Sequence, residues 1–392
     1  MNVLKTELQI KESAKRLSAD ARPMLEKLGV PAGRLVLHED AFVSMLYLER
    51  RRAERAQKRF VLMLVDVKRI LGEGQKNRTL GKVTNAILSV TRETDIVGWY
   101  LEDQLIGVIG TEIGKCKPKN VQAKMLDKVK TAFTAALPKE KIAQITVSFH
   151  FFPEEWEDGA TDHSANITLY PDLSRKEESR KFELGLKRAM DVAGSALALA
   201  LLSPLFGTIA LAIRLSSKGP VLFRQERLGQ FGKKFTLLKF RSMRTDCDPR
   251  IHQEYVSQFI AGQVDDGNRE GDKTVFKIQQ DPRVTSVGRF LRKTSLDELP
   301  QFWNVLAGQM SLVGPRPPVA YEFTAYDLWH RRRVLEIKPG MTGLWQVEGR
   351  SRTRFDDMVR LDLKYARAWS IWLDVKILLQ TPGAVLTGDG AH

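Results

Sequence analysis

The longest apolar stretch of the chain, residues 189–213, reads AMDVAGSALALALLSPLFGTIALAI and contains Ser203-Pro204 near its centre. A straight helix over residues 192–213 would rise about 33 Å, enough to cross a hydrocarbon core of about 30 Å. Pro204 removes a backbone donor and clashes with the preceding turn, so a kink there would fold the stretch into a helical hairpin within one leaflet. A soluble core helix seldom carries so long an apolar run on all its faces, so the pattern predicts a membrane segment.

Basic residues border this stretch on both sides. Lys187 and Arg188 precede it, and Arg214 and Lys218 follow it. A spanning helix normally has its excess of Lys and Arg on one side only. The charge pattern therefore favours a re-entrant segment over residues 187–218, with both flanks on the cytoplasmic side, while a spanning helix and a buried core helix remain the alternatives.

Ahead of this segment, the pattern predicts a β-α-β-β-α-β unit. Residues 60–67 form a continuous apolar run typical of a buried strand, and residues 145–151 alternate apolar and polar side chains. Between them, two apolar runs flank residues 101–103 as a hairpin, and helices are expected near residues 78–92 and 118–136. This order of elements predicts a ferredoxin-like sandwich.

The whole chain is thus expected to be an α+β protein. Its N-terminal domain is ferredoxin-like, and a re-entrant helix leads to a C-terminal domain. The predicted segments are a helical region (residues 1–32), the first domain (33–153), a polar linker (154–186), the membrane segment (187–218) and the C-terminal domain (219–392).

Charge narrows the choice of partners. Lys and Arg number 62 against 47 Asp and Glu, which gives a net charge of +15. The chain has no nucleic-acid-binding motif, so an anionic leaflet or an anionic substrate explains the excess better than nucleic acid does. Cys116 and Cys247 are isolated, which fits a reducing compartment. The run at residues 331–333, three arginines, is open to two interpretations: contact with lipid headgroups or a solvated helix face.

The strongest candidate chemistry lies in the sequence RKTSLDELPQFWNVLAGQMSLVGPRPP. Asp297 and Glu298 are adjacent carboxylates within it. Arg292 and Arg316 lie in the same stretch, a cationic setting that would keep Asp297 ionised and available as a nucleophile or a metal ligand. The same residues also fit a helix start, because Ser295-x-x-Glu298 has the spacing of a capping box. Spacing alone leaves both interpretations open.

Taken with its surroundings, this stretch resembles the monotopic polyprenyl-phosphate phosphoglycosyl transferases, the bacterial sugar transferases, over residues 187–390. The motifs that carry the resemblance are KRAMD (187–191), Ser203-Pro204, LFRQERLGQFGKKF, KFRSM (239–243), DPRVTSVGRFLRKTSLDELPQFWNVLAGQMSLVGPRP (281–317), KPGMTGLWQVEGR (338–350) and DLKYARAWSIWLDVKILLQT (362–381). In such enzymes, an Asp attacks the β-phosphorus of a nucleotide-diphosphate sugar, releases the nucleoside monophosphate and passes the sugar phosphate to a polyprenyl phosphate.

The resemblance implies a small, helix-rich mixed α/β catalytic domain that is Mg²⁺-dependent and lies on the cytoplasmic face of the bacterial inner membrane. Asp297 and Glu298 would be catalytic, Asp297 would bind Mg²⁺ with Glu298 as a second ligand, and the re-entrant helix would break at Ser203-Pro204. The expected donor is a UDP-sugar, the acceptor is undecaprenyl phosphate, and the pathway is exopolysaccharide, capsule or O-antigen assembly. The basic residues expected to bind substrate phosphates are Lys239, Arg241, Arg292, Arg316 and Arg350.

Residues 33–153 resemble the diguanylate cyclase (GGDEF) domain in pattern, with changed chemistry. Residues 100–104 read YLEDQ where that family has Gly-Gly-Asp-Glu-Phe, and Lys68 stands where a second acidic residue often follows the one matched by Asp66. We therefore expect no cyclase activity and instead a regulatory or self-associating domain, in a homodimer or higher oligomer. The alternative for the whole chain is an inactive signalling or scaffold protein regulated through this domain.

Overall fold

The computed structural model describes residues 36–70, 76–111, 113–114, 117–153, 165–244, 250–260, 269–270, 273–274, 283–349 and 354–386. The chain forms two compact units. One comprises residues 1–155 with 168–172, and the other comprises residues 156–167 with 173–392. The predicted helical region 1–32 and Arg350 lie outside the described residues.

The first unit contains a four-stranded antiparallel sheet in the order β2-β3-β1-β4. Its strands are β1 (Phe60–Asp66), β2 (Ile96–Leu101), β3 (Leu105–Gly110) and β4 (Thr146–Phe152). Its helices are α2 (Glu39–Ala56), η1 (Lys68–Ile70), α3 (Lys76–Val90), α4 (Pro118–Ala136) and α5 (Lys139–Ile142). Apart from the short η1 and α5, the order from β1 to β4 is strand, helix, strand, strand, helix, strand, so the predicted order is confirmed.

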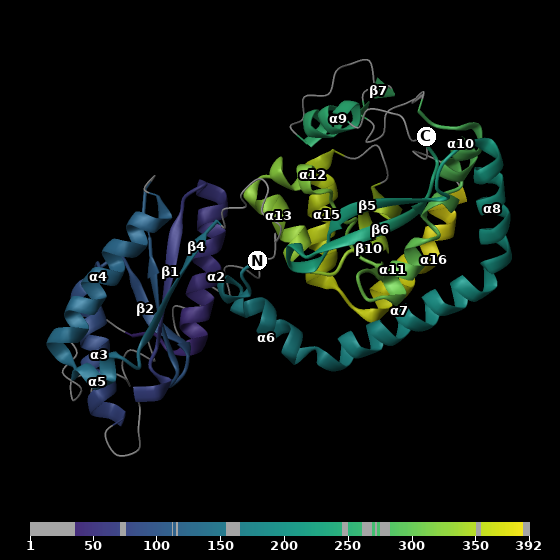
Figure 1. Ribbon diagram of the computed structural model, residues 1–392. Coiled ribbons are helices and arrows are strands. Elements are labelled where there is room, and N and C mark those ends of the chain that lie inside the picture. The colour runs from purple at the N-terminus through teal and green to yellow at the C-terminus, as the bar shows by residue number, and fades with distance from the viewer. Residues whose placement is uncertain are drawn as a thin grey trace. The chain divides into compact units, whose positions relative to one another are not determined.

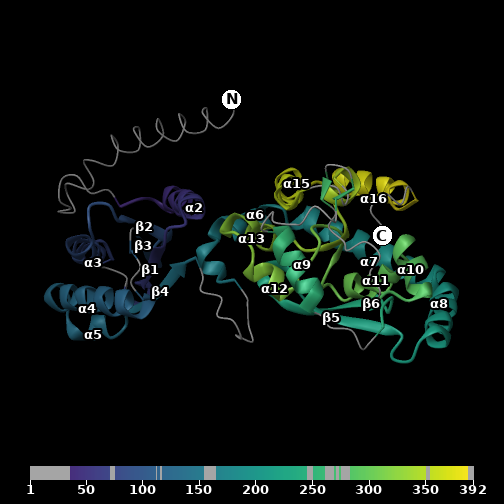
Figure 2. The ribbon, with the colours of Figure 1, turned by 90° about the horizontal axis from the view of Figure 1, so that it is seen from above.

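Helices cover both faces of this sheet, with α2 on one face and α3 and α4 on the other (Figures 1 and 2). Strand β1 is an unbroken apolar run for this reason, and all its residues except Asp66 are buried. On the face toward α2, Gly98 and Gly107 pair across β2 and β3, and the Phe42 ring lies against both. A Cβ at Gly107 would lie 2.4 Å from that ring, so glycine is what permits this close approach.

The second unit consists mainly of helices around short pairs of strands. Its helices are α6 (Pro171–Ser179, from Leu173 on), α7 (Lys181–Leu201), α8 (Ser203–Ser216), α9 (Arg250–Ile260), α10 (Ser286–Lys293), η5 (Leu296–Glu298), α11 (Gln301–Leu306), α12 (Ala320–Thr324), α13 (Leu328–Leu335), α14 (Leu344–Glu348), α15 (Phe355–Ala368) and α16 (Ile371–Leu386). Strands β5 (Leu222–Leu228) and β6 (Lys234–Phe240) form a hairpin, β9 (Ser311–Val313) and β10 (Gly340–Thr342) are parallel, and β7 (Arg269–Glu270) pairs with β8 (Lys273–Thr274).

The predicted membrane segment corresponds to α7 and α8, which follow the lower and right-hand border of the unit in Figure 1. Helix α7 begins at Lys181, ahead of the expected boundary at residue 187, and the chain bends by 61° between Leu201 and Ser203. Within the described part of the chain, no single helix is long and apolar enough to cross a bilayer, whereas the bent pair meets that test of length and composition.

Helix α7 buries polar side chains and exposes apolar ones. Lys187, Asp191 and Ser195, spaced one turn apart, are its buried residues. Leu197 and Leu201 are 60% and 69% exposed, and α8 exposes further leucines. This is the reverse of a water-facing helix on a soluble domain, and it leaves an apolar surface suited to lipid.

Two expectations about basic residues are wrong. Lys187 is not a free cationic flank of the membrane segment, because it is 6% exposed and its Nζ lies 2.6 Å from a carboxylate oxygen of Asp374. Arg332 and Arg333 do not form a solvated helix face: they are only 8% and 5% exposed and form ion pairs within the unit. The sequence places these basic residues next to apolar ones, but it does not reveal the acidic residues with which they form ion pairs.

Candidate active site

The acidic pair lies on a tight turn between two helices. Thr285 caps α10, since its Oγ1 accepts a hydrogen bond from Gly288 N at 2.9 Å. After α10 ends, Ser295 adopts a left-handed conformation with φ of 55°, and the single 3-10 turn η5 follows. The Ser295 side chain caps nothing, so the capping-box interpretation is wrong. A left-handed serine costs on the order of 1 kcal/mol, and such strain is commonest at functional sites.

The two carboxylates of the turn have different surroundings. Asp297 is 8% exposed, whereas the side chain of Glu298 is 36% exposed. Successive residues of a 3-10 helix point about 120° apart, which accounts for the difference. Lys239 Nζ lies 2.6 Å from Glu298 Oε1, so strand β6 and the turn η5 bring a predicted phosphate-binding lysine to the acidic pair.

Arg241 is buried and Arg292 is half-buried, and each has buried guanidinium donors that are not used by any described residue. Arg241 Nη2 donates to the carbonyl and hydroxyl oxygens of Ser217, at 2.7 and 2.9 Å, and so fastens the end of β6 to the chain after α8. Its Nε and Nη1, and Nη1 of Arg292, are buried without a hydrogen-bond partner among the residues that the structure describes. Buried donors in this state suit an anionic ligand.

Arg316 belongs to a second group of charged residues. It lines a pocket together with Glu322, Tyr326, Arg333 and Trp345, among others. Burial and the charge of Arg316 lower the pKa of Arg227 to about 10. By their contacts, the predicted phosphate-binding residues therefore fall into two groups: Lys239 is beside the acidic pair, and Arg316 is among the buried charges of this pocket.

Sequence reasoning missed most of the second group. Arg227 and Glu322 are 5% exposed, and the Arg333–Asp362 pair is buried with a closest N–O distance of 2.7 Å. Burial raises the pKa of Asp362 to about 6, although the charge of Arg333 opposes this shift. One signal was present: Asp362 lies at a core-facing position of the amphipathic helix α15, and a charge there requires a partner.

A divalent cation at this site would have few protein ligands. Among the described residues, no cluster of three or more His, Cys, Asp or Glu side chains could hold a metal ion. Mg²⁺ in phosphate-transfer sites commonly uses only one or two carboxylates plus substrate phosphates and water. The adjacent Asp297 and Glu298 fit that smaller requirement.

Comparison with known proteins identifies relatives of the second unit. Residues 182–388 match the family model described as bacterial sugar transferase. Three relatives are each 44% identical to this chain over the aligned residues. The galactosyl transferase CpsE of Streptococcus agalactiae aligns with 52% of this chain and 43% of its own length, and the undecaprenyl-phosphate galactose phosphotransferase of Salmonella typhimurium with 53% and 42%. The UDP-glucose:undecaprenyl-phosphate glucose-1-phosphate transferase of Escherichia coli aligns with 50% of this chain and 39% of its own length. The chain spans less than half the length of these relatives.

Solved structures give weaker likenesses. A DGC protein from Thermotoga maritima is 19% identical, with 32% of this chain and 87% of that chain covered and a TM-score of 0.26. The GGDEF domain of DgcB from Caulobacter crescentus in complex with c-di-GMP is 16% identical, with 31% and 75% covered and a TM-score of 0.24. Likenesses at this level carry no argument, so the resemblance of residues 33–153 to that domain stays a prediction.

Proposed function

Because the chain belongs to the bacterial sugar transferase family, we propose that it transfers a sugar phosphate from a nucleotide-diphosphate sugar to a polyprenyl phosphate at a membrane. The observation that carries the proposal is the turn after α10, where buried Asp297 and the Lys239–Glu298 pair lie within the segment that matches the family. The names of the relatives support undecaprenyl phosphate as acceptor and a UDP-hexose as donor.

In the proposed first step, a carboxylate oxygen of Asp297 attacks the β-phosphorus of the donor. The new bond is Asp297 Oδ–P, and the bond that breaks joins this phosphorus to the oxygen bridging to the α-phosphate. The nucleoside monophosphate leaves with the electron pair. An anionic nucleophile reaches a pyrophosphate only where cations neutralise the phosphate oxygens. Lys239, together with the partly unpaired guanidinium groups of Arg241 and Arg292, would provide positive charge for this.

In the second step, an oxygen of the polyprenyl phosphate attacks the same phosphorus and releases the Asp297 carboxylate. Glu298, which is more exposed than Asp297, is suited to accept a proton from the incoming phosphate. Bound Mg²⁺ would neutralise charge on the donor phosphates, with Asp297 and Glu298 as its protein ligands. Because the two substrates use the site in turn, a soluble donor and a lipid acceptor need not be bound together.

An assay with a donor panel tests the proposed function. The purified protein in nanodiscs would be given undecaprenyl phosphate, MgCl₂ and one of several UDP-sugars. We expect release of UMP and formation of a lipid-linked sugar diphosphate with one UDP-hexose. Absence of nucleoside monophosphate release with every nucleotide sugar offered would leave the inactive scaffold as the better account.

The bent pair α7–α8 is proposed to enter and leave the cytoplasmic leaflet of the bacterial inner membrane. Both ends should then react from the cytoplasmic side. Lys187 cannot report on this because it is buried, so the probes are Lys181→Cys, with a side chain that is 75% exposed, and Lys218→Cys. In a background with Cys116 and Cys247 replaced by serine, a membrane-impermeant maleimide should label neither site in intact cells and both in inverted vesicles. If one site reacts from outside the cell, the pair spans the membrane.

The first unit is proposed to act in self-association or regulation, and a homodimer or higher oligomer remains the expectation. Its β2–β3 turn is held to the start of α2 by a hydrogen bond from Glu102 N to Glu39 Oε2 at 2.6 Å. Asp66 Oδ1 accepts a hydrogen bond from Lys68 N at 3.0 Å, so this carboxylate already has a partner within its own loop.

A further inference from the structure

Side chains of α7 hold the backbone of the short strand β9. Leu312 N donates to Asp191 Oδ1 at 2.9 Å, and Ser311 Oγ donates to the same oxygen at 3.0 Å. The carbonyl oxygen of Val313 accepts from Lys187 Nζ at 3.1 Å. A three-residue strand paired with one neighbour has little stability of its own, so these side chains are part of what fixes its position.

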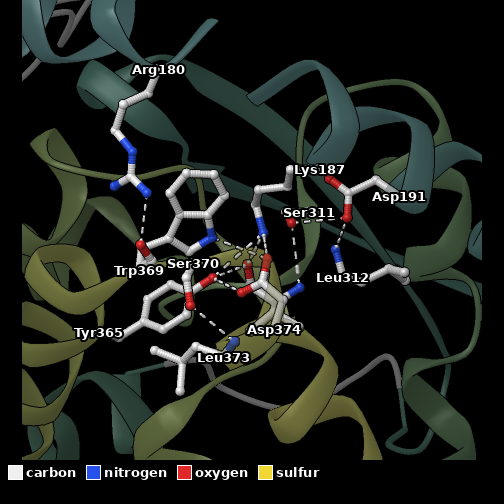
Figure 3. Close-up of polar contacts among 11 residues, drawn as sticks. Arg180, Lys187, Asp191, Ser311, Leu312, Tyr365, Trp369, Ser370, Leu373 and Asp374 are labelled. Carbon is white, nitrogen blue, oxygen red and sulfur yellow. Dashed lines mark hydrogen bonds and ion pairs between the residues drawn. The ribbon is translucent and has the colours of Figure 1, made fainter. Parts of the chain in front are cut away.

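Lys187 is in turn held by a buried polar cluster from the C-terminal helices (Figure 3). Its Nζ lies 2.6 Å from Asp374 Oδ2, and Tyr365 OH and Trp369 Nε1 donate to the same carboxylate at 2.6 and 3.1 Å. All four residues are less than 9% exposed. Burial raises the pKa of Tyr365 well above its usual value, so the phenol remains a donor. Because three donors share one carboxylate, the positions of the side chains in this cluster are tightly constrained.

Strand β9 leads directly into the Gly314-Pro315-Arg316 segment, which has little room to move. A Cβ at Gly314 would lie 2.3 Å from the carbonyl oxygen of Lys338, and Gly340 N donates to the carbonyl of Pro315 at 2.8 Å. A shift of β9 would therefore be passed on to Arg316. Arg188, also on α7, donates to the carbonyls of Val305 and Leu306 at the end of α11, the helix that follows the acidic pair.

We propose that Lys187, Asp191 and Asp374 are positioning residues that fix the first half of the bent helix pair to β9 and so set Arg316 for the donor step. The inference rests, for its catalytic consequence, on the proposed function and on the predicted phosphate-binding role of Arg316. It assigns to α7 a second task besides the proposed membrane association: the apolar face is available to lipid, and the polar face holds the strand that leads into the Arg316 segment. Displacement of α7 would then change the rate of nucleoside monophosphate release.

The variants must separate positioning from folding. Lys187→Met alone leaves the Asp374 charge buried without its cation, and such a change can unfold the unit. The double variant Lys187→Met, Asp374→Asn removes both charges at nearly constant volume. Lys181→Met is the matched control, because it removes an exposed lysine from the same helix.

Two measurements on the full chain in nanodiscs test the proposal. One is the single-turnover rate of nucleoside monophosphate release from the preferred UDP-sugar without lipid acceptor, and the other is hydrogen exchange in a peptide covering residues 311–317. In the double variant we expect a thermal midpoint near that of the wild type, release slowed by about tenfold or more, and exchange faster by a similar factor. Lys181→Met should match the wild type in both.

Wild-type release and wild-type exchange in a folded double variant would overturn the proposal. If that variant does not fold, the same two measurements are made on Asp191→Asn, which keeps the shape of the side chain and removes only the charge that orders β9. Its release rate and hydrogen exchange then decide whether the proposal stands. If the wild-type protein releases no nucleoside monophosphate, the proposed function has failed, and the exchange measurement still shows whether the cluster holds residues 311–317.

Discussion

Replacing Asp297 with asparagine should reduce sugar-phosphate transfer by about 10⁴-fold or more, the size of loss seen when other covalent nucleophiles are removed. Asparagine keeps the shape of the side chain but lacks the anionic oxygen that attacks phosphorus. The turn should persist, because Asp297 lies in a local 3-10 turn that Leu299 and Pro300 connect to α11. The measurement is the initial rate of lipid-linked product formation at saturating donor and acceptor.

Asp357→Asn is the matched control, since it makes the same change at a half-exposed carboxylate paired with Arg360. It should retain activity within about twofold. Transfer that survives in a folded Asp297→Asn protein would mean direct transfer between the substrates. The acidic pair would then be reassigned to metal binding.

Replacing Arg333 with methionine should destabilise the second unit by about 3–5 kcal/mol, because it leaves the Asp362 carboxyl buried without its cation, so that this group must either stay charged and unpaired or take up a proton. For a unit of this size we expect the thermal midpoint to fall on the order of 10 °C. Arg360→Met, at an arginine with a side chain that is 68% exposed, should change stability by less than about 0.5 kcal/mol.

A second substitution tests whether loss of the Arg333–Asp362 ion pair is what lowers the stability. Adding Asp362→Leu to Arg333→Met removes the carboxyl left without a partner and should recover most of the lost stability, since paired charges and apolar groups of similar volume are often equivalent inside proteins. Equal stability of Arg333→Met and Arg360→Met would show that the buried pair contributes no more than a surface pair.

Sequence was sufficient for features that depend on neighbouring residues. The apolar run of β1, the alternation in β4 and the turn between β2 and β3 lie where the pattern placed them. The break between α7 and α8 is at Leu202, immediately before Ser203-Pro204, because proline starts a helix more readily than it continues one. Each of these depends on a few residues of local sequence.

Contacts between residues far apart in the sequence could not be predicted from the pattern of hydrophobic and polar positions. Lys187 precedes an apolar run and therefore resembled a cationic flank, and its partner Asp374 is 187 positions further along the chain. The Lys239–Glu298 contact joins residues 59 positions apart. Ser295 had the spacing of a cap, but its backbone is left-handed and its side chain makes no cap hydrogen bond.

The most direct test of the account is the chemical state of Asp297 after exposure to the donor. The protein would be incubated with the preferred UDP-sugar and Mg²⁺ without polyprenyl phosphate, quenched, digested and analysed by mass spectrometry. We predict a phosphosugar adduct on the peptide that contains Asp297, formed in step with UMP release and lost when polyprenyl phosphate is added. Full turnover without any adduct on that peptide would contradict the covalent mechanism.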